Sequence, residues 1–379
     1  MKVLHVFKTY YPYSKGGIEK AIFELVAGML QHKVVSNVLA FADKYEVIDN
    51  GASRIFFFKK TAEFASTPFS IAALWKFKKI AASHDIIHYH FPYPFADIMH
   101  FFSRIKKPYL VTYHADIVKQ KTLRKLYRPL ARLFLKRADS IIATSPNYLQ
   151  SSRLLSQFKN KTEVIPLGIH EKACQSHMTA AKDWTREFGQ KPFFLFVGAL
   201  RYYKGLHILI DAASGAPYPV VILGAGSIEQ TLKQQVKANH VTNVHFVGAL
   251  DHGDKVALLK RCRALVFPSH LRSEAFGLSL VEGAMFSKAL ISSEIGTGTS
   301  YINLNGKTGI VIPPNDRGAL RQAMDKLWED RKLAEEMGKN AYQRYQKLFT
   351  ADRMVLSYLE KYRQLYAKQA TEHHSGNGL

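Results

Sequence analysis

Short apolar runs alternate along this chain with segments in which apolar residues recur every three or four positions. In the first half, the runs predict strands at residues 2–7, 34–41, 54–58, 85–90, 109–113, 139–144 and 163–166. Amphipathic segments between them predict helices, as at 18–30 and 123–137. Strands that alternate with helices of this length are typical of βαβ units, so we expect a parallel sheet.

A second series of the same kind follows a polar, aperiodic stretch at residues 168–190. Its predicted strands are 193–197, 220–223, 244–247, 264–268, 289–293 and 310–313. Later helices are expected at 319–332 and 351–367, before a frayed tail at 373–379. The pattern predicts an α/β protein with two doubly wound domains, residues 1–170 and 171–350. The last helix, 351–368, is placed to pack back on the first domain.

The overall composition favours two globular domains that remain in the cytoplasm. The chain has 379 residues, and its 47% hydrophobic content is enough for two cores. No window approaches the roughly 18 to 20 apolar residues of a spanning helix, and Lys2 and Lys8 bring charge too early for a signal peptide. Cys174 and Cys262 form no CxxC pair, which agrees with a reducing compartment, and we expect both to be inert.

The net charge is large and uneven. The chain carries a formal charge of +23, and residues 1–170 contribute 26 Lys and Arg against 11 Asp and Glu, which is +15. A charge of this size predicts an anionic partner, which could be a phospholipid surface, a phosphorylated substrate or nucleic acid. The sequence contains no RNP, helix-turn-helix or zinc-finger pattern. Nucleic acid is therefore not expected as the partner.

One segment of the first half combines charge with apolar residues. Residues 119–137 hold eight basic residues and no acid, interleaved with leucine and aromatic residues. Such a stretch resembles an interfacial membrane helix; the alternative is an ordinary half-buried helix with a solvated basic face. The runs at 56–60 and 101–107 repeat the combination of aromatic and basic residues, which favours an anionic membrane surface.

Two carboxylates lie eight positions apart around a glycine-marked junction of loop and helix. Glu274 follows the predicted strand at 264–268, and Glu282 lies on the helix that begins after Gly277. Because open α/β sheets bind ligands at the carboxyl ends of their strands, both side chains are expected to reach one crevice. Carboxylates accept strong hydrogen bonds from pairs of hydroxyl groups, so the ligand would be polyhydroxylated. The alternative is that Glu274 caps the helix and Glu282 is a solvated helix residue.

Cationic and glycine-rich turns follow the other strands of the second half. After the strand at 193–197, Gly198 permits a close turn, and Arg201 and Lys204 are spaced to converge on a phosphate group at a helix N-terminus. A basic helix start exposed to water is the alternative. Residues 294–300 either cradle a diphosphate or form a merely structural loop. Two further strand-end turns would let the backbone approach a nucleotide, and they contain Gly224, Gly248 and Ala249.

In the first half, three groups of residues lie at predicted strand ends. Gly16 and Gly17 precede the first helix and would let a sugar or phosphate reach its N-terminal amides. His88 and His90 share one strand face, a spacing compatible with zinc, but no third and fourth ligand follow at a recognisable interval, so no metal site is predicted. His114 ends the next strand and points to the same region; a purely structural histidine is the alternative.

Taken together, these motifs resemble the family 4 retaining glycosyltransferases of GT-B fold. The resemblance rests on the Glu-x7-Glu signature after the Lys204-Gly205 turn, and it extends from the Gly16-Gly17 loop to the final helices. It implies two Rossmann-like domains that face each other across a cleft, the first binding the acceptor and the second the nucleotide sugar. The family often has arginine directly after the strand-end glycine, where this chain has Ala199, so Arg201 would have to replace it.

The resemblance also implies roles for individual residues. Glu282 would bind the ribose hydroxyls, and Glu274 would bind those of the donor sugar. Arg201 and Lys204 would hold the leaving diphosphate without a divalent metal, and His114 would lie beside the reacting sugar carbon. The remaining donor contacts, many from the backbone, would come from Phe276, Gly277, Leu278, Gly198, Gly224, Gly248 and Ala249.

Residues 5–12, 114–117 and 296–301 are similar to bacterial lipopolysaccharide mannosyltransferases that use GDP-mannose. This similarity implies a retaining enzyme that moves mannose to a saccharide linked through diphosphate to a polyprenyl lipid, in lipopolysaccharide, O-antigen or related polysaccharide synthesis. Such an enzyme would be a peripheral protein on the anionic cytoplasmic face of the inner membrane. Other GT-B donors, namely UDP-GlcNAc, UDP-glucose or GDP-rhamnose, are alternatives. A protein that binds nucleic acid or anionic surfaces is a more distant one.

Overall fold

The chain forms two compact α/β units. The computed structural model describes residues 1–14, 16–64, 67–117, 121–171 and 182–376. The first unit contains Met1–Gly168 and the segment that begins at Ala351, and the second contains Ile169–Thr350. The predicted boundary after residue 170 lies close to this division. The C-terminal helix α15 (Ala351–Gly376) belongs to the first unit, where it packs against α1 (Gly17–Leu30).

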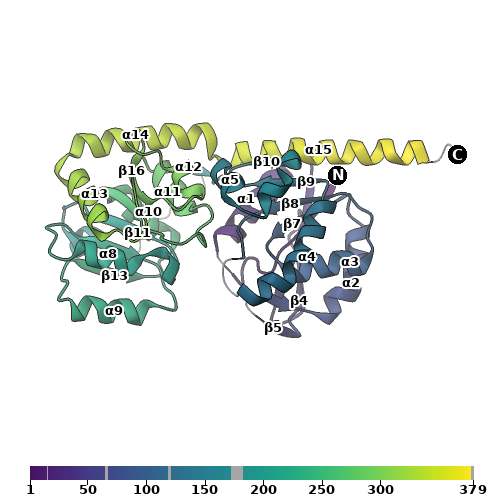
Figure 1. Ribbon diagram of the computed structural model, residues 1–379, viewed down its shortest axis with the longest axis horizontal. Helices are drawn as coiled ribbons and strands as arrows, with labels where there is room; N and C mark the ends of the chain where they lie inside the picture. Colours follow the sequence, from purple (N-terminus) through teal and green to yellow (C-terminus); the bar gives the residue numbers. More distant parts are fainter. Residues whose placement is uncertain (15, 65–66, 118–120, 172–181, 377–379) are drawn as a thin grey trace. The chain divides into compact units, whose positions relative to one another are not determined.

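An eight-stranded sheet forms the centre of the first unit (Figure 1). Its strand order is β10 (Thr162–Val164), β9 (Ser140–Ala143), β8 (Tyr109–Tyr113), β7 (Ile86–Phe91), β1 (Lys2–Val6), β2 (Val35–Ala42), β4 (Arg54–Lys59) and β3 (Glu46–Asp49). All neighbours pair in parallel except β3, which runs antiparallel to β4. The sequence did not predict β3, a short edge strand with partly exposed side chains, or the antiparallel pair β5 (Ala62–Phe64) and β6 (Thr67–Phe69).

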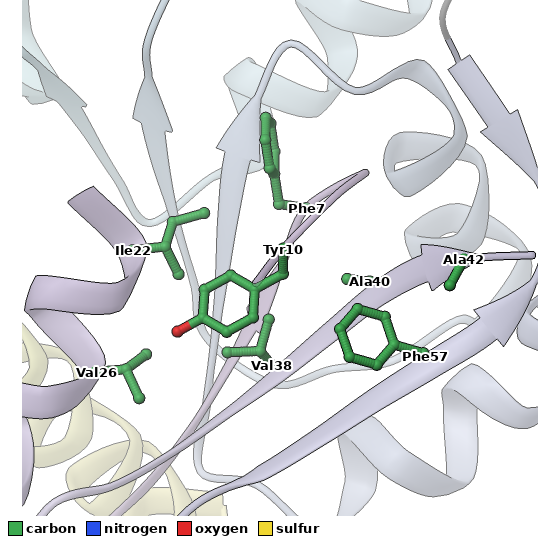
Figure 2. Packing of buried hydrophobic residues seen from close by; sticks show 8 residues of the cluster. All are labelled: Phe7, Tyr10, Ile22, Val26, Val38, Ala40, Ala42 and Phe57. Carbon is green, nitrogen blue, oxygen red and sulfur yellow. The ribbon is translucent and has the colours of Figure 1, made fainter. Parts of the chain in front are cut away.

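The hydrophobic core between α1 and the sheet is well defined. Ile22 and Val26 of α1 pack in one cluster with residues of β2 and β4. The β2 residues of this cluster alternate along the strand, so they point to the same side of the sheet. Figure 2 shows this cluster, in which the other members are Phe7, Tyr10, Val38, Ala40, Ala42 and Phe57. Burial of these side chains fixes the register of β1 beside β2 and so places the carboxyl ends of both strands at one edge.

The remaining helices of the first unit lie between the strands in sequence. They are α2 (Ile71–Ala82), α3 (Pro94–Ser103), α4 (Lys121–Arg137), α5 (Pro146–Ser151) and the 3-10 segment η1 (Leu155–Lys161). The prediction of a frayed tail from residue 373 was wrong in part, since α15 continues to Gly376. No glycine or proline interrupts the helix before that position.

The second unit contains a six-stranded sheet that is parallel throughout. Its order is β13 (Val244–Gly248), β12 (Val220–Leu223), β11 (Phe194–Val197), β14 (Ala264–Phe267), β15 (Ala289–Ser293) and β16 (Gly309–Ile312). The strand order reverses between β11 and β14, just as it reverses between β1 and β7 in the first sheet. In open α/β sheets, ligands bind in the crevice beyond the carboxyl ends of strands at such a reversal.

Helices connect the strands of the second unit. They are α7 (Trp184–Phe188), the 3-10 turn η2 (Tyr202–Lys204), α8 (Leu206–Ala213), α9 (Glu229–Ala238), α10 (His252–Arg261), α11 (Leu278–Met285), α12 (Gly298–Ile302), α13 (Arg317–Glu329) and α14 (Arg331–Leu348). The helix predicted at 319–332 is confirmed over most of its length by α13, but its predicted end is wrong, because α13 ends at Glu329. Asp330 separates α13 from α14, and its carboxylate caps α14 by accepting a 2.9 Å hydrogen bond from the Leu333 amide.

Candidate functional site

A buried ion pair joins the two central strands of the second sheet at their carboxyl ends. Lys204, in the turn after β11, donates to Glu274, in the loop after β14, and the two residues are 9% and 8% exposed. The Ser269 hydroxyl donates to the same carboxylate oxygen over 3.3 Å. Lys204 Nζ also lies 4.4 Å from the centroid of the Phe267 ring. The sequence-predicted cation and carboxylate therefore meet at the reversal point of this sheet.

A glycine makes this meeting geometrically possible. Gly205 follows Lys204 directly and has a φ of 72°, in the left-handed region that favours glycine. A Cβ at this position would overlap the carbonyl oxygen of Pro268. The turn after β11 therefore lies directly against the backbone at the end of β14, and Gly205 positions the neighbouring Lys204 side chain.

The second carboxylate lies on α11 and is also buried. Glu282 is 6% exposed and accepts a 2.9 Å hydrogen bond from Lys255 of α10. This burial excludes the alternative that Glu282 is a solvated helix residue. The N-cap of α11 is Gly277, with a φ of 94°, so Glu274 does not cap this helix. Lys255 was not predicted as part of the site, because its position in an ordinary polar helix face gives no signal.

Phe276, Gly277 and Leu278 form the entry to α11. Phe276 is buried, and its backbone is in close contact with Gly298, where a Cβ would lie 2.8 Å from the Phe276 Cα atom. The Gly298 amide donates a 2.8 Å hydrogen bond to the carbonyl of Ala275. The loop before α11 is thus held by the start of α12. This contact fixes the backbone that the sequence predicts to bind the donor.

Three glycine turns lie next to one another at the ends of β11, β12 and β13. Gly198, Gly224 and Gly248 all have positive φ values, of 154°, 141° and 73°. The Gly198 amide donates to the Leu223 carbonyl over 3.0 Å, and the Gly224 amide donates to Gly248 over 2.8 Å. The exposed residue Ala249 follows the third turn. The predicted glycine turns therefore form one continuous backbone surface.

Arg201 lies outside the Lys204–Glu274 ion pair, and the 294–300 loop makes hydrogen bonds within itself. Arg201 is exposed, and its guanidinium lies 3.4 Å from the Ser227 hydroxyl rather than in the Lys204 ion pair. In the loop, the Glu294 carboxylate accepts hydrogen bonds from the Gly296 amide and the Ser300 hydroxyl. An anionic carboxylate that already uses these donors favours the structural alternative for this loop over a diphosphate cradle.

The Gly16-Gly17 loop of the first unit contains an acidic residue that the sequence prediction overlooked. Gly16 is the N-cap of α1, and the buried carboxylate of Glu19 lies against it. Glu19 accepts 2.7 Å hydrogen bonds from the hydroxyls of Thr9 and Ser14. A carboxylate at this helix N-terminus disfavours a phosphate there, whereas a sugar hydroxyl remains compatible with it.

Four buried histidines gather at the reversal point of the first sheet. His90 Nδ1 lies 3.0 Å from His114 Nε2, and His90 Nε2 lies 3.1 Å from His5 Nδ1. The His88 ring nitrogens lie 2.7 Å from the hydroxyls of Tyr362 and Thr112. Burial lowers the pKa of His5 and of His114 to about 3, with a further contribution from His84 at His5. No local pattern points to His5, because only the pairing of β1 with β7 brings it to this group.

An aromatic surface of the first unit lies on α2 and α3. Trp75 and Phe102 are 69% and 48% exposed, and their rings meet edge to face with centroids 5.3 Å apart. Basic residues lie close to them along the chain, three in α2 and three in the loop after α3: Lys76, Lys78, Lys79, Arg104, Lys106 and Lys107. Leu126 of α4 is also exposed, while Phe134 and Leu135 of the same helix are buried. Among the described residues, no helix is long and apolar enough to span a membrane.

Two protein-family models match most of the chain. The model for Glycosyltransferase Family 4 matches residues 15–172, and the model for glycosyl transferases group 1 matches residues 179–344. The chain is 47% identical over 364 residues to the O-antigen chain mannosyltransferase C of Escherichia coli, covering 96% of this chain and 98% of that protein. It is 49% identical over 354 residues to the D-rhamnosyltransferase WbpZ of Pseudomonas aeruginosa, covering 93% of both.

Solved structures share the fold at lower identity. A sucrose-phosphate synthase from Thermosynechococcus elongatus matches 97% of this chain and 99% of its own, with a TM-score of 0.80 and 21% identity. Anabaena Alr3699/HepE in complex with UDP and glucose matches 96% of this chain and all of its own, with a TM-score of 0.76 and 19% identity. These similarities show the two-unit architecture.

Proposed function

This chain belongs to the GT-B glycosyltransferases that combine a family 4 domain with a group 1 domain, and on that basis we propose that it transfers mannose from GDP-mannose with retention of configuration. The acceptor would be a saccharide linked to a polyprenyl lipid through diphosphate, in O-antigen or related lipopolysaccharide synthesis. The name of the Escherichia coli relative supports the sugar and the pathway. The observation that carries the proposal is the buried Lys204–Glu274 pair at the reversal point of the second sheet.

The charge arrangement accounts for the chemical step. The bond between the anomeric carbon and the diphosphate oxygen breaks, and negative charge develops on the departing diphosphate. Lys204 would stabilise that charge, with a smaller contribution from the exposed Arg201, so no divalent metal is needed. The acceptor oxygen bonds to the anomeric carbon on the face that the diphosphate leaves. A departing phosphate oxygen takes the acceptor's proton, so no separate protein base is required.

Binding of the donor would redistribute the hydrogen bonds that the site already holds. Glu274 would accept from hydroxyls of the sugar while Lys204 moves its interaction toward the diphosphate. Glu282, held by Lys255 through one oxygen, would accept the ribose hydroxyls. Gly198, Gly224 and the backbone at Phe276–Leu278 would lie against the phosphates and the base.

A rhamnosyl donor is the second candidate, since the Pseudomonas aeruginosa relative is a D-rhamnosyltransferase. A thermal-shift and hydrolysis screen with GDP-mannose, GDP-rhamnose, UDP-glucose and UDP-GlcNAc tests the choice. We expect GDP-mannose to give the largest increase in Tm and the fastest hydrolysis. A larger effect of GDP-rhamnose would mean that rhamnose, not mannose, is the transferred sugar. A larger effect of either UDP sugar would contradict a donor that carries guanine. The Glu282→Gln variant is the control, because it should lose the stabilisation by every donor.

Peripheral attachment to an anionic membrane is a further part of the proposal. The exposed pair Trp75 and Phe102 lies on α2 and α3, and the chain carries three lysines in α2 and three basic residues in the loop after α3. Aromatic side chains partition into the lipid interface, and nearby cations are attracted to anionic headgroups. A polyprenyl-linked acceptor is confined to the membrane, so an enzyme that docks through this surface would remain close to its substrate.

A further inference from the structure

Three imidazole rings form a continuous hydrogen-bonded row at the reversal point of the first sheet. His5 lies one residue before the end of β1, His90 lies one residue before the end of β7, and His114 directly follows β8. The ring planes of His5 and His90 differ by 17°, and those of His90 and His114 differ by 23°. His88 stands outside the row, since hydroxyl groups engage both of its nitrogens.

The row allows only two arrangements of its protons. Burial keeps the three rings neutral, and a neutral imidazole carries one N–H. Each of the two internal hydrogen bonds uses one of these three N–H groups. The third must therefore lie at one end of the row, either on His5 Nε2 or on His114 Nδ1. In both arrangements the opposite end carries a bare lone pair.

The surroundings of the two ends favour one arrangement. His5 Nε2 and His114 Nδ1 are both buried, and neither has a hydrogen-bond partner among the described residues. His5 is 0% exposed, whereas His114 is 4% exposed and lies beyond the end of its strand. An unpaired N–H is rarer in protein interiors than an unpaired acceptor, because its desolvation is less readily compensated. The bare lone pair therefore belongs on His5 and the free N–H on His114.

A bound metal ion accounts for this group of histidines less well than hydrogen bonds do. The ligand atoms that His5, His88 and His90 could offer are spread over as much as 4.8 Å. Two nitrogens bound to one zinc ion can be at most about 4.2 Å apart, twice the Zn–N distance of about 2.1 Å. Coordination would also break hydrogen bonds that the rings already make, and no carboxylate belongs to this group to offset the charge.

We propose that His90 and His5 are positioning residues that hold His114 as the neutral tautomer protonated on Nδ1. In this state the His114 Nε2 lone pair accepts from His90, so His114 cannot take a proton as a general base. It instead offers a hydrogen bond to an oxygen of the bound substrate. This contact and the identity of the oxygen rest on the proposed function, whereas the tautomer itself does not.

The tautomer can be measured directly by NMR on the full-length protein with ¹⁵N-labelled histidine and no substrate. Long-range ¹H–¹⁵N correlation distinguishes protonated from bare ring nitrogens. We expect His5, His90 and His114 all to be protonated on Nδ1 and bare on Nε2 at pH 7. Protonation of His114 on Nε2, a charged imidazolium, or a bound metal ion at these rings would overturn the proposal.

Two substitutions of His5 separate positioning from packing. The Asn side chain of His5→Asn offers an amide oxygen that can accept from His90 Nε2–H, so part of the His114 population should move to the Nε2 tautomer. His5→Phe removes the His5 N–H that keeps His90 Nε2 bare but offers no acceptor in its place, so the Nε2 tautomer of His114 should be more populated than in the wild type and less than in His5→Asn. His100→Phe, which removes a buried histidine bonded to Tyr89 outside the row, is the matched control. An unchanged His114 tautomer in His5→Asn, with the fold intact, would contradict the role of His5.

Addition of GDP-mannose to the labelled wild type tests the substrate contact separately. We expect the His114 Nδ1 proton to shift downfield with no change of tautomer. The expected tautomer without such a shift would remove the contact with substrate and leave the row as described. A failed transfer assay would therefore not be mistaken for failure of the imidazole row.

Discussion

Lys204 and Glu274, which are 70 positions apart in the sequence, form a buried ion pair at the carboxyl edge of the second sheet. Each charge is removed from water and depends on the other for compensation, so removal of either one costs more than the pair itself contributes. The cation that we propose for catalysis is therefore oriented before substrate arrives. Its loss should therefore affect both the chemistry and the stability of the second unit.

Lys204→Ala should reduce turnover by a factor on the order of 100 to 1000, because a fixed donor to the developing negative charge is lost. The same change should lower the free energy of unfolding by about 3 kcal/mol, since Glu274 is left buried without its partner. Steady-state kinetics and urea denaturation measure the two effects. Near-normal turnover in this variant would remove Lys204 from the mechanism.

The double variant Lys204→Met with Glu274→Gln serves as the control for stability. Both charges are absent, so most of the lost free energy of unfolding should return, while activity remains low. Recovery of activity together with stability would mean that the ion pair is only structural.

Glu282→Gln should weaken binding of GDP by about 10- to 100-fold, because hydrogen bonds from hydroxyls to a charged acceptor contribute roughly 1.5 to 3 kcal/mol. Isothermal titration calorimetry measures the change. Glu229→Gln, a surface carboxylate of α9 paired with Lys233, is the matched control and should bind GDP like the wild type. If both variants bound GDP with equal affinity, the ribose would not bind at Glu282.

Gly205→Ala should destabilise the protein much more than Gly215→Ala. Both glycines have nearly the same φ, 72° and 68°, so the cost of a left-handed alanine is similar, about 1 kcal/mol. Only at Gly205 would the new methyl group overlap another backbone atom, the Pro268 oxygen, whereas nothing lies within 4 Å at Gly215. Thermal unfolding of both variants tests this, and equal decreases in Tm would show that the turn can relax.

The sequence was sufficient to predict the doubly wound character of both units. The buried strands β8 and β12 consist of apolar residues apart from Thr112, and their predicted bounds agree with the structure. Edge elements were missed for a physical reason. β3 is half exposed and therefore has no apolar run, and the break at Asp330 depends on a single capping hydrogen bond.

The site residues were predicted less completely than the strands. Glu274, Glu282 and Lys204 lie in motifs whose spacing along the chain is informative. Lys255 and His5 join the two sites only through the pairing of distant strands and helices, which no local pattern records. Glu19 is different, because it lies three positions after Gly16 and its partners Thr9 and Ser14 are close in the sequence. The arrangement of the two units across a cleft stays a prediction from the family resemblance.

Trp75→Ala combined with Phe102→Ala should weaken binding to vesicles that contain anionic phospholipid by at least about tenfold, since two exposed aromatic side chains no longer enter the interface. Flotation at low salt measures the bound fraction. Leu356→Ala, which removes an exposed leucine of α15 on the same unit, is the control and should bind normally. Failure of the wild type to float would contradict membrane attachment.

Stability should fall as the pH is lowered below about 6.5, because the buried histidines are neutral in the folded protein. The pKa of His5 and of His114 is lowered to about 3, so between pH 6.5 and 3 the unfolded chain binds protons that the folded chain does not. Each such histidine lowers the free energy of unfolding by up to about 1.4 kcal/mol per pH unit within that window, and contributes no pH dependence above it. Urea denaturation at pH 7.5, 6.0 and 5.0 should show this decline. In His5→Phe the free energy of unfolding should fall less steeply with pH, by up to about 1.4 kcal/mol per pH unit, because one buried histidine is absent. Parallel curves for His5→Phe and the wild type would mean that His5 takes up a proton in the folded state.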